Sequence, residues 1–253
     1  MKTKSVKLQS LQGKSMSTLK HYQLDSVIPP HAAYLQQTEV RMLQLRKDHI
    51  ISQAYILPIP YLCQIYHLLN LKHLETVHKF SLKGLRISNV SQIETTPIGG
   101  SIKFQTTLDP AVNILRVWRK PTIEVELILH TPYTIELNIP IYHNRKITII
   151  FNMLPLADNI HKLFIDIYSN VIFPKPILQI ILHCASCLTL FEDLPYLNEL
   201  ADGNPYRWVR STRAGNRDTM QLFKRFVELY GSSLEQPQSS GAIELRPIPD
   251  PAC

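Results

Sequence analysis

The chain has 253 residues, of which 45% are apolar and 19% charged, so it can fill the core of one large domain and is not a disordered sequence. Its formal net charge is +7, but its only acid-free basic stretch, residues 1–24, leads into no basic helix interleaved with aromatic residues, which argues against nucleic-acid binding. The four cysteines lack both a preceding signal peptide and the spacing of a disulfide framework, which favours the cytoplasm.

Three regions follow one another along the chain. We expect residues 1–50 to form a basic lead that is poorly ordered apart from a helix over Ala33–Lys47. Residues 51–232 contain the strong apolar patterns and are expected to form one domain. Residues 233–253 are rich in proline and serine and are expected to form a loose tail.

From about Arg86 onward, apolar and polar residues alternate, as in strands with one buried and one solvent-facing side. The clearest examples are Thr122–Leu129 and Tyr133–Ile141, which a turn at Thr131–Pro132 would connect. Four further strands are expected over Ser101–Thr107, Asn113–Arg119, Lys146–Leu154 and His161–Ser169. Consecutive strands with short connections predict an antiparallel meander.

Two helices are expected after the strands. Ile177–Leu200 is apolar nearly all round until Glu192, which predicts a buried helix. Its most apolar part, Pro176–Phe191, is shorter than the roughly 20 residues of a bilayer span, so we expect no membrane span. Arg217–Tyr230 carries an apolar stripe and is followed by Gly231, which is well placed to end it. The sequence thus predicts an α+β fold in which an antiparallel sheet wraps a long C-terminal helix, a helix-grip (START-like) arrangement with a hydrophobic pocket between the layers.

The segment Tyr66–Gly84 carries three histidines, His67, His73 and His78, and a neutral imidazole is a common metal ligand. On an ideal helix the five-residue step from His73 to His78 turns roughly 500°, which leaves the two side chains about 140° apart. They can therefore meet at a metal only where the helix ends or loosens between them. The alternative is a surface helix whose histidines are ordinary polar residues and whose leucines point inward.

Two carboxylates, Glu192 and Asp193, interrupt the apolar helix, and a buried carboxylate is costly unless it is paired or bound to a metal. They suit a third metal ligand, or they mark the point where the helix emerges into solvent. Cys184 and Cys187 form a Cys-x-x-Cys pair preceded by His183, which suits zinc binding or disulfide exchange. The chain has no second pair and no thioredoxin-like context, so these cysteines are more simply small apolar residues of a buried helix.

Taken together, three motifs resemble the catalytic domain of Rieske-type non-heme iron oxygenases, in particular the vanillate-demethylase and pheophorbide-oxygenase branches. The stretch "HLLNLKHLETVHKFSLKG" is similar to the family's Asn-x-x-Asp-x-x-His-x4-His segment, "LFEDLPYL" to its acidic C-terminal segment, and "TMQLFKRFVELYG" to its terminal helix. The resemblance covers about residues 55–231. It implies Fe(II) bound by His73, His78 and Asp193, with Glu192 as the fallback ligand, and open positions on the iron for dioxygen.

The chain departs from the family's pattern at two positions. Asn70 stands where the family has an aspartate that links the iron site to the Rieske cluster of a neighbouring subunit, and we treat it as the candidate catalytic residue. His67 stands where the family has an asparagine, and we expect it to lie outside the ligand set. None of the four cysteines has the Cys-x-His or Cys-x-x-His spacing of a Rieske cluster, so we expect no iron–sulfur cluster in this chain and no N-terminal Rieske domain.

These features lead us to expect an orphan oxygenase domain that acts on an apolar substrate, aromatic or terpenoid, with O2. Its electrons would come from a separate Rieske or ferredoxin partner, and the resemblance leaves a homo-oligomer open. Two alternatives remain at this point: a hydrophobic-ligand-binding module without redox chemistry, and the remnant of a truncated gene.

Overall fold

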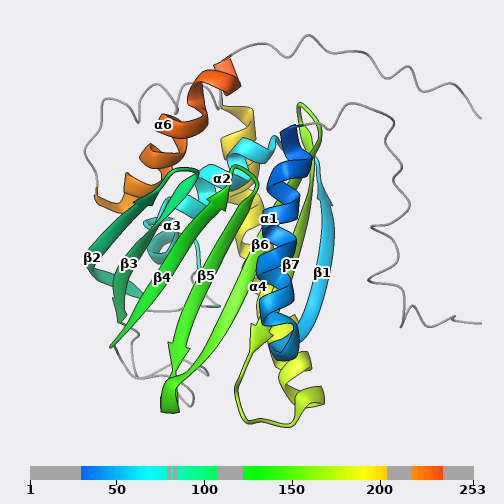
Figure 1. The fold of residues 1–253 in the computed structure, drawn as a ribbon, viewed down its shortest axis with the longest axis vertical. Helices are drawn as coiled ribbons and strands as arrows, with labels where there is room; N and C mark the ends of the chain where they lie inside the picture. Colours follow the sequence, from blue (N-terminus) through cyan, green and yellow to red (C-terminus); the bar gives the residue numbers. More distant parts are fainter. Residues whose placement is uncertain (1–29, 79–80, 82–84, 108–121, 204–217, 236–253) are drawn as a thin grey trace, which may run out of the picture.

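A seven-stranded antiparallel sheet forms the body of the protein (Figure 1). The computed structural model describes residues 30–78, 81, 85–107, 122–203 and 218–235. The strands lie in the order β1-β7-β6-β5-β4-β3-β2, and all neighbours are antiparallel. Their bounds are β1 His49–Leu57, β2 Arg86–Thr96, β3 Gly99–Thr107, β4 Thr122–Thr131, β5 Thr134–Ile141, β6 Arg145–Ala157 and β7 Ile160–Ser169.

The expected meander is confirmed, because β2 to β7 follow one another across the sheet. The expected turn at Thr131–Pro132 joins β4 to β5. The strand expected over Asn113–Arg119 lies outside the described residues. Neither β1 nor β2 is among the expected strand ranges, although the alternation was placed from about Arg86, where β2 begins. β1 comes before the meander and extends the sheet by pairing with β7. Residues 30–50, which we assigned to the basic lead, therefore supply a helix and the start of an edge strand.

One face of the sheet is apolar because the strand register aligns the inward-facing residues. Leu127 on β4 pairs with Leu137 on β5, which pairs with Ile149 on β6, and Ile149 pairs with Ile167 on β7. This row belongs to the main hydrophobic core, in which Leu127 and Ile167 are buried and Leu137 and Ile149 are half-buried. The period-two pattern of the sequence is therefore the pattern that places the core on one side of the sheet.

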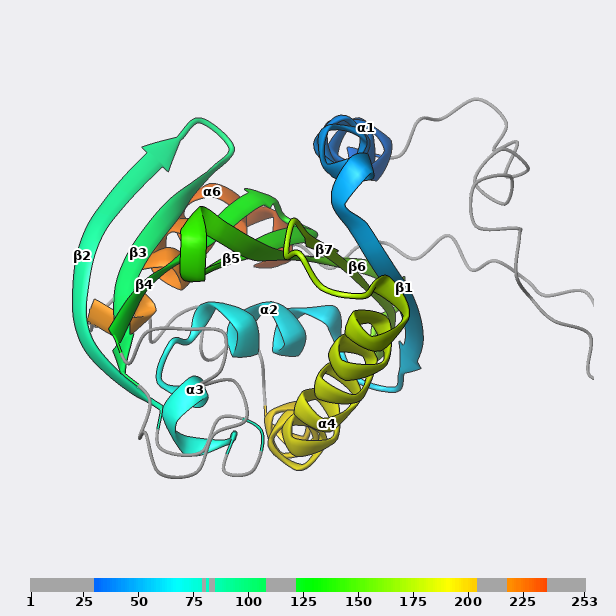
Figure 2. The ribbon, with the colours of Figure 1, turned by 90° about the horizontal axis from the view of Figure 1, so that it is seen from below.

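Helices lie on both faces of the curved sheet (Figure 2). The concave side holds α2, α3 and α4, and the convex side holds α1. α6 packs against β3 and α2, and the rings of Tyr66 on α2 and Phe223 on α6 meet edge to face with centroids 5.0 Å apart. The α+β class, the antiparallel sheet and the long helix are thus confirmed. The helix bounds are α1 Pro30–Leu45, α2 Tyr61–Leu69, α3 His73–Thr76, α4 Lys175–Asp202 and α6 Gln221–Glu235.

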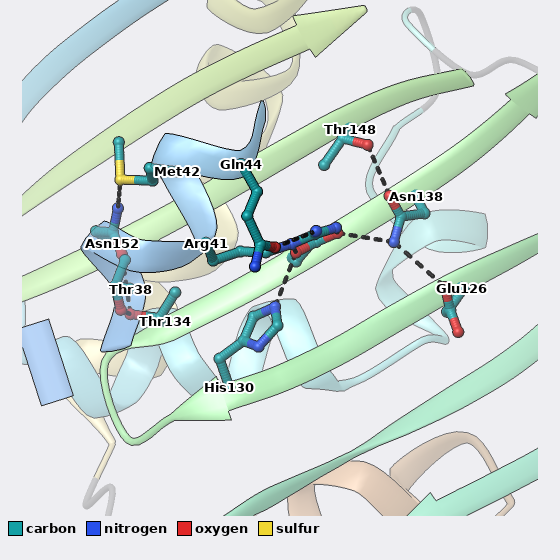
Figure 3. Close-up of polar contacts among 11 residues, drawn as sticks. Thr38, Arg41, Met42, Gln44, Glu126, His130, Thr134, Asn138, Thr148 and Asn152 are labelled. Carbon is teal, nitrogen blue, oxygen red and sulfur yellow. Dashed lines mark hydrogen bonds and ion pairs between the residues drawn. The ribbon is translucent and has the colours of Figure 1, made fainter. Parts of the chain in front are cut away.

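The outer side of β5 is buried, which corrects the expectation that it faces solvent. α1 covers it, and the fully buried carboxylate of Glu136 accepts hydrogen bonds from Arg41 at 2.6 and 2.8 Å (Figure 3). His130 Nε2 and Asn138 Nδ2 lie 2.8 and 2.9 Å from the same carboxylate. The polar residues of β5 therefore form the surface on which α1 packs. Their hydrogen bonds satisfy buried polar groups that the alternating sequence pattern had predicted to face solvent.

The long helix α4 is only partly buried, contrary to the expectation of a helix buried all round. Ile180 is 64% exposed and Phe191 is 72% exposed, whereas Leu182 and Leu190 face the core. The helix lies along β1, so one side contacts the sheet and α2 while the opposite side has no described element against it. By length and composition alone α4 could cross a membrane. Its buried side nevertheless carries Asp193, which belongs to the polar cluster described next.

Candidate metal centre

The three histidines of Tyr66–Gly84 are separated by breaks in the helix. α2 ends at Leu69 because Asn70 adopts an extended backbone, with φ −90° and ψ 90°. α3 is a single turn that starts at His73 and ends at Thr76, so the helix stops before His78. The break that a His-x4-His metal pair requires is therefore present. The alternative of a surface helix is wrong, because His67 is fully buried and His73 and His78 are each only 5% exposed.

The histidines meet the carboxylate of Asp193, which the last third of α4 brings to them. His67 Nε2 lies 3.0 Å from Asp193 Oδ1, and His78 Nε2 lies 3.4 Å from the same oxygen. The His73 ring lies between the other two, with its centroid 4.0 Å from that of His67 and 5.4 Å from that of His78. Among the described residues, donor atoms of His67, His73 and Asp193 all lie within 4.8 Å of one another.

Two acceptors fix the orientation of the imidazole rings. The backbone carbonyl of Asn70 lies 2.6 Å from His73 Nδ1. A carbonyl oxygen can only accept, so this nitrogen carries the proton and Nε2 keeps its lone pair for a metal. The carboxylate of Glu192 lies 3.4 Å from His78 Nδ1 and also accepts hydrogen bonds from the backbone N–H and the hydroxyl of Ser81. A carboxylate behind a histidine is the usual way to orient a metal ligand.

Burial sets the charge state of the cluster. It lowers the pKa of His67 to about 3, with a further contribution from His78, and it lowers the pKa of His73 well below the ordinary value. It also raises the pKa of Asp193 to about 6, although the neighbouring His78 and His73 oppose this shift. At neutral pH His67 and His73 are therefore neutral and the Asp193 carboxylate is largely ionised, which is the protonation state in which these groups bind a divalent cation.

The donor set fits such a cation. Both ring nitrogens of His67 and Oδ1 of Asp193 are buried and have no hydrogen-bond partner among the described residues, although His67 Nε2 and Asp193 Oδ1 are only 3.0 Å apart. Buried polar atoms without partners are rare, and an ion is one of the few explanations for several in one cluster. Imidazole and carboxylate ligands suit iron and zinc alike.

The other residues that the sequence singled out are placed as follows. Asn70 lies beside the cluster; its side chain accepts a hydrogen bond from the backbone N–H of Lys72, and its carbonyl holds His73. Glu192, the fallback ligand, lies behind His78 and not between the histidines. Cys184 is exposed on α4, so the expectation that it is a small apolar residue of a buried helix is wrong. Cys187 contacts His183 and, across to β1, Gln53 and Tyr55, each at the length of a weak sulfur contact.

Sequence reasoning set His67 aside, yet its side chain is part of the cluster. On an unbroken helix its position six residues before His73 and eleven before His78 would place it about 120° from His73 and about 20° from His78, so spacing alone could not bring it together with both. The extended backbone at Asn70 resets the helical phase and turns His67 toward Asp193. The contact between His67 and Asp193 depends on the tertiary packing of α2 against α4, which the sequence does not show.

Comparison with known proteins gives a likeness in fold. Neither a protein-family model nor a curated protein sequence matches this chain. The structure of dicamba monooxygenase bound to 3,6-dichlorosalicylic acid matches with a TM-score of 0.55 and 11% identity, over 74% of this chain and 60% of that chain. Pseudomonas putida CBB5 NdmA with caffeine matches with a TM-score of 0.51 and 13% identity, over 70% of this chain and 49% of that one. The chain thus spans about half to three-fifths of these proteins, and the likeness shows the fold of Rieske oxygenase catalytic domains.

Proposed function

We propose that this chain is a mononuclear non-heme iron oxygenase domain that binds Fe(II) through His73, His78 and Asp193. One observation carries the proposal: these three side chains come from two distant segments and converge in one buried cluster that contains polar atoms without partners. The fold likeness to two monooxygenases supports the same reading. We also propose that the sheet and α4 form a helix-grip arrangement and that the protein works in the cytoplasm.

The residues of the site have distinct roles in this proposal. His73 and His78 would supply ring nitrogens, and Asp193 would supply a carboxylate oxygen and the negative charge. The Asn70 carbonyl and the Glu192 carboxylate hold the two rings so that one nitrogen of each faces the metal. Fe(II) in this site would supply the redox chemistry of dioxygen, and in this proposal its electrons would come from a separate Rieske or ferredoxin protein. The role of Asn70 as the catalytic link to that partner is part of the proposal.

The substrate we propose is apolar, either aromatic or terpenoid. The support comes from the inner face of β5 and β6, where Leu137, Ile139, Ile149 and Phe151 are only half-buried although they lie against the main core. Half-buried apolar side chains on the concave side of the sheet can still gain contact area from a nonpolar ligand. The same surface would serve the alternative function, the binding of a hydrophobic ligand without redox chemistry.

Iron content tests the metal part of the proposal. We expect the full chain, purified and loaded with Fe(II) without oxygen, to retain about one iron per chain, and His73→Ala and Asp193→Ala to lose it. His161→Asn is the matched control, because His161 is equally buried but donates to the Ile59 carbonyl away from the cluster. Wild-type protein that retains no iron would refute the proposal.

Open coordination positions test the oxygenase part. We expect nitric oxide, which occupies the positions that dioxygen would use, to give the EPR signal of an iron–nitrosyl complex in wild-type protein. An oxygenated product of an apolar aromatic or terpenoid substrate that forms only with O2, an added ferredoxin and its reductase would then identify an oxygenase. Iron-loaded protein that binds nitric oxide but yields no oxygen-dependent product, while a lipophilic ligand co-purifies with it, would favour the ligand-binding alternative instead.

A further inference from the structure

We propose that His67 is a third histidine ligand of this centre, so that the protein offers the metal three imidazoles and one carboxylate and not a two-histidine set. The inference rests on the proposed function only in requiring that the cluster bind a metal. It concerns a residue that the motif resemblance places outside the ligand set.

The distances to Asp193 carry the argument. Two ligands of one ion with bonds of about 2.1 Å lie about 3.0 Å apart at a right angle and about 3.4 Å apart at a tetrahedral angle. The separations of Asp193 Oδ1 from His67 Nε2 and from His78 Nε2 are 3.0 and 3.4 Å. His67 Nε2 therefore lies at a distance from Asp193 Oδ1 that suits two ligands of one ion. It is no farther from that oxygen than His78 Nε2 is.

The surroundings of His67 exclude the usual structural role of a buried histidine. His161, which is equally buried, places Nδ1 2.8 Å from a backbone carbonyl. Neither nitrogen of His67 has such a partner among the described residues, and its ring lies tilted against those of His73 and Tyr196, with centroids 4.0 and 5.5 Å away. A fully buried imidazole with two unsatisfied nitrogens is costly, because each loses its hydrogen bonds to water. A bond from Nε2 to a metal removes one of these two costs.

The fourth ligand changes what the centre can do. On a six-coordinate ion, four protein ligands leave two positions for dioxygen and solvent, fewer than a facial triad leaves. On a four-coordinate ion the same set closes the site, as in structural zinc centres. His67 thus makes the identity of the bound metal decide whether the centre is open to chemistry or closed.

The test counts the imidazoles on the metal by NMR of the Co(II)-loaded full chain. Each histidine bound to Co(II) gives one strongly shifted ring N–H signal that disappears in D2O. We expect three such signals in wild-type protein and two in His67→Asn, which places an asparagine at the position where the resembling family has one. His161→Asn should keep all three. In a chelator competition, His67→Asn should weaken Co(II) binding by more than the about 10- to 100-fold that loss of an outer hydrogen-bond partner costs.

The outcomes separate this inference from the proposed function. Two signals in wild-type protein, unchanged in His67→Asn, would overturn the role of His67 and leave the centre of His73, His78 and Asp193 intact. No shifted signal in wild-type protein at saturating Co(II) would overturn both. Circular dichroism of the two variants, compared with wild type, keeps a folding defect from being read as a lost ligand.

Discussion

Removal of the Arg41 side chain should uncouple α1 from the sheet. Arg41 donates two hydrogen bonds to Glu136, whose side chain is fully buried on the outer face of β5. Burial alone would raise the pKa of Glu136, but the hydrogen bonds from Arg41 and His130 outweigh it and lower the pKa to about 2. In Arg41→Met the carboxylate keeps only the His130 and Asn138 contacts, and most of this stabilisation of the charged form is lost.

The size of the effect follows from the pKa. A shift from the ordinary value of 4.5 to about 2 corresponds to about 3 kcal/mol of stability. Because the folded-state pKa is lowered, this stability is fully present above pH 4.5 and is lost as the pH falls from 4.5 toward 2. We therefore expect Arg41→Met to cost about 3 kcal/mol at pH 7, in line with other broken buried pairs, and to differ much less from wild type near pH 2.

Urea unfolding followed by circular dichroism at several pH values measures both quantities. Arg46→Met is the matched control, since Arg46 lies just after the same helix with its side chain exposed, and it should change stability by less than about 0.5 kcal/mol at any pH. Equal effects of the two substitutions at pH 7, or an Arg41→Met effect that stays constant from pH 7 to pH 2, would refute the assigned role of the Glu136 pair.

Two further predictions concern Glu192, which lies beside His78, and the exposed side of α4. Glu192→Gln should lower metal affinity about 10- to 100-fold in a chelator competition while leaving the fold intact, because an amide orients the His78 ring less well; unchanged affinity would mean that Glu192 does not position His78. Ile180→Lys should change the free energy of unfolding by less than about 0.5 kcal/mol, whereas Leu182→Ala should cost about 2–5 kcal/mol in the same urea titration. Similar values for the two would contradict the assigned difference in burial, and a larger cost for Ile180→Lys would show that α4 has its opposite side in the core.

The sequence predicted the meander well because its strands alternate cleanly, but it missed β1. In His49–Leu57 the buried positions include the polar Gln53, whereas the apolar Ile56 is 67% exposed, so the alternation of apolar and polar residues is blurred. Gln53 is tolerated inside because its amide contacts His183 on α4 at 2.7 Å. That contact joins residues 130 positions apart, and local pattern cannot supply it.

The same limit explains which parts of the candidate site could be foreseen. Spacing showed that His73 and His78 need a helix break, and the short α3 provides it. Spacing could not show that the break at Asn70 turns His67 inward, because helical phase carries no information across an extended residue. Nor could apolar composition show which side of α4 is buried, since nearly every side of it is apolar until Glu192.

α3 itself shows why the site depends on distant parts of the chain. A helix of one turn is not stable alone, because nucleation costs more than its few hydrogen bonds return. Contacts from outside hold it in place: the backbone N–H of Leu71 donates to Thr219 just before α6, and Glu75 accepts from the backbone N–H of Ile87 at the start of β2. The position of His73 is therefore set by the closing helix and the first strand of the meander. The terminal helix thus contributes to the candidate centre without supplying a ligand to it.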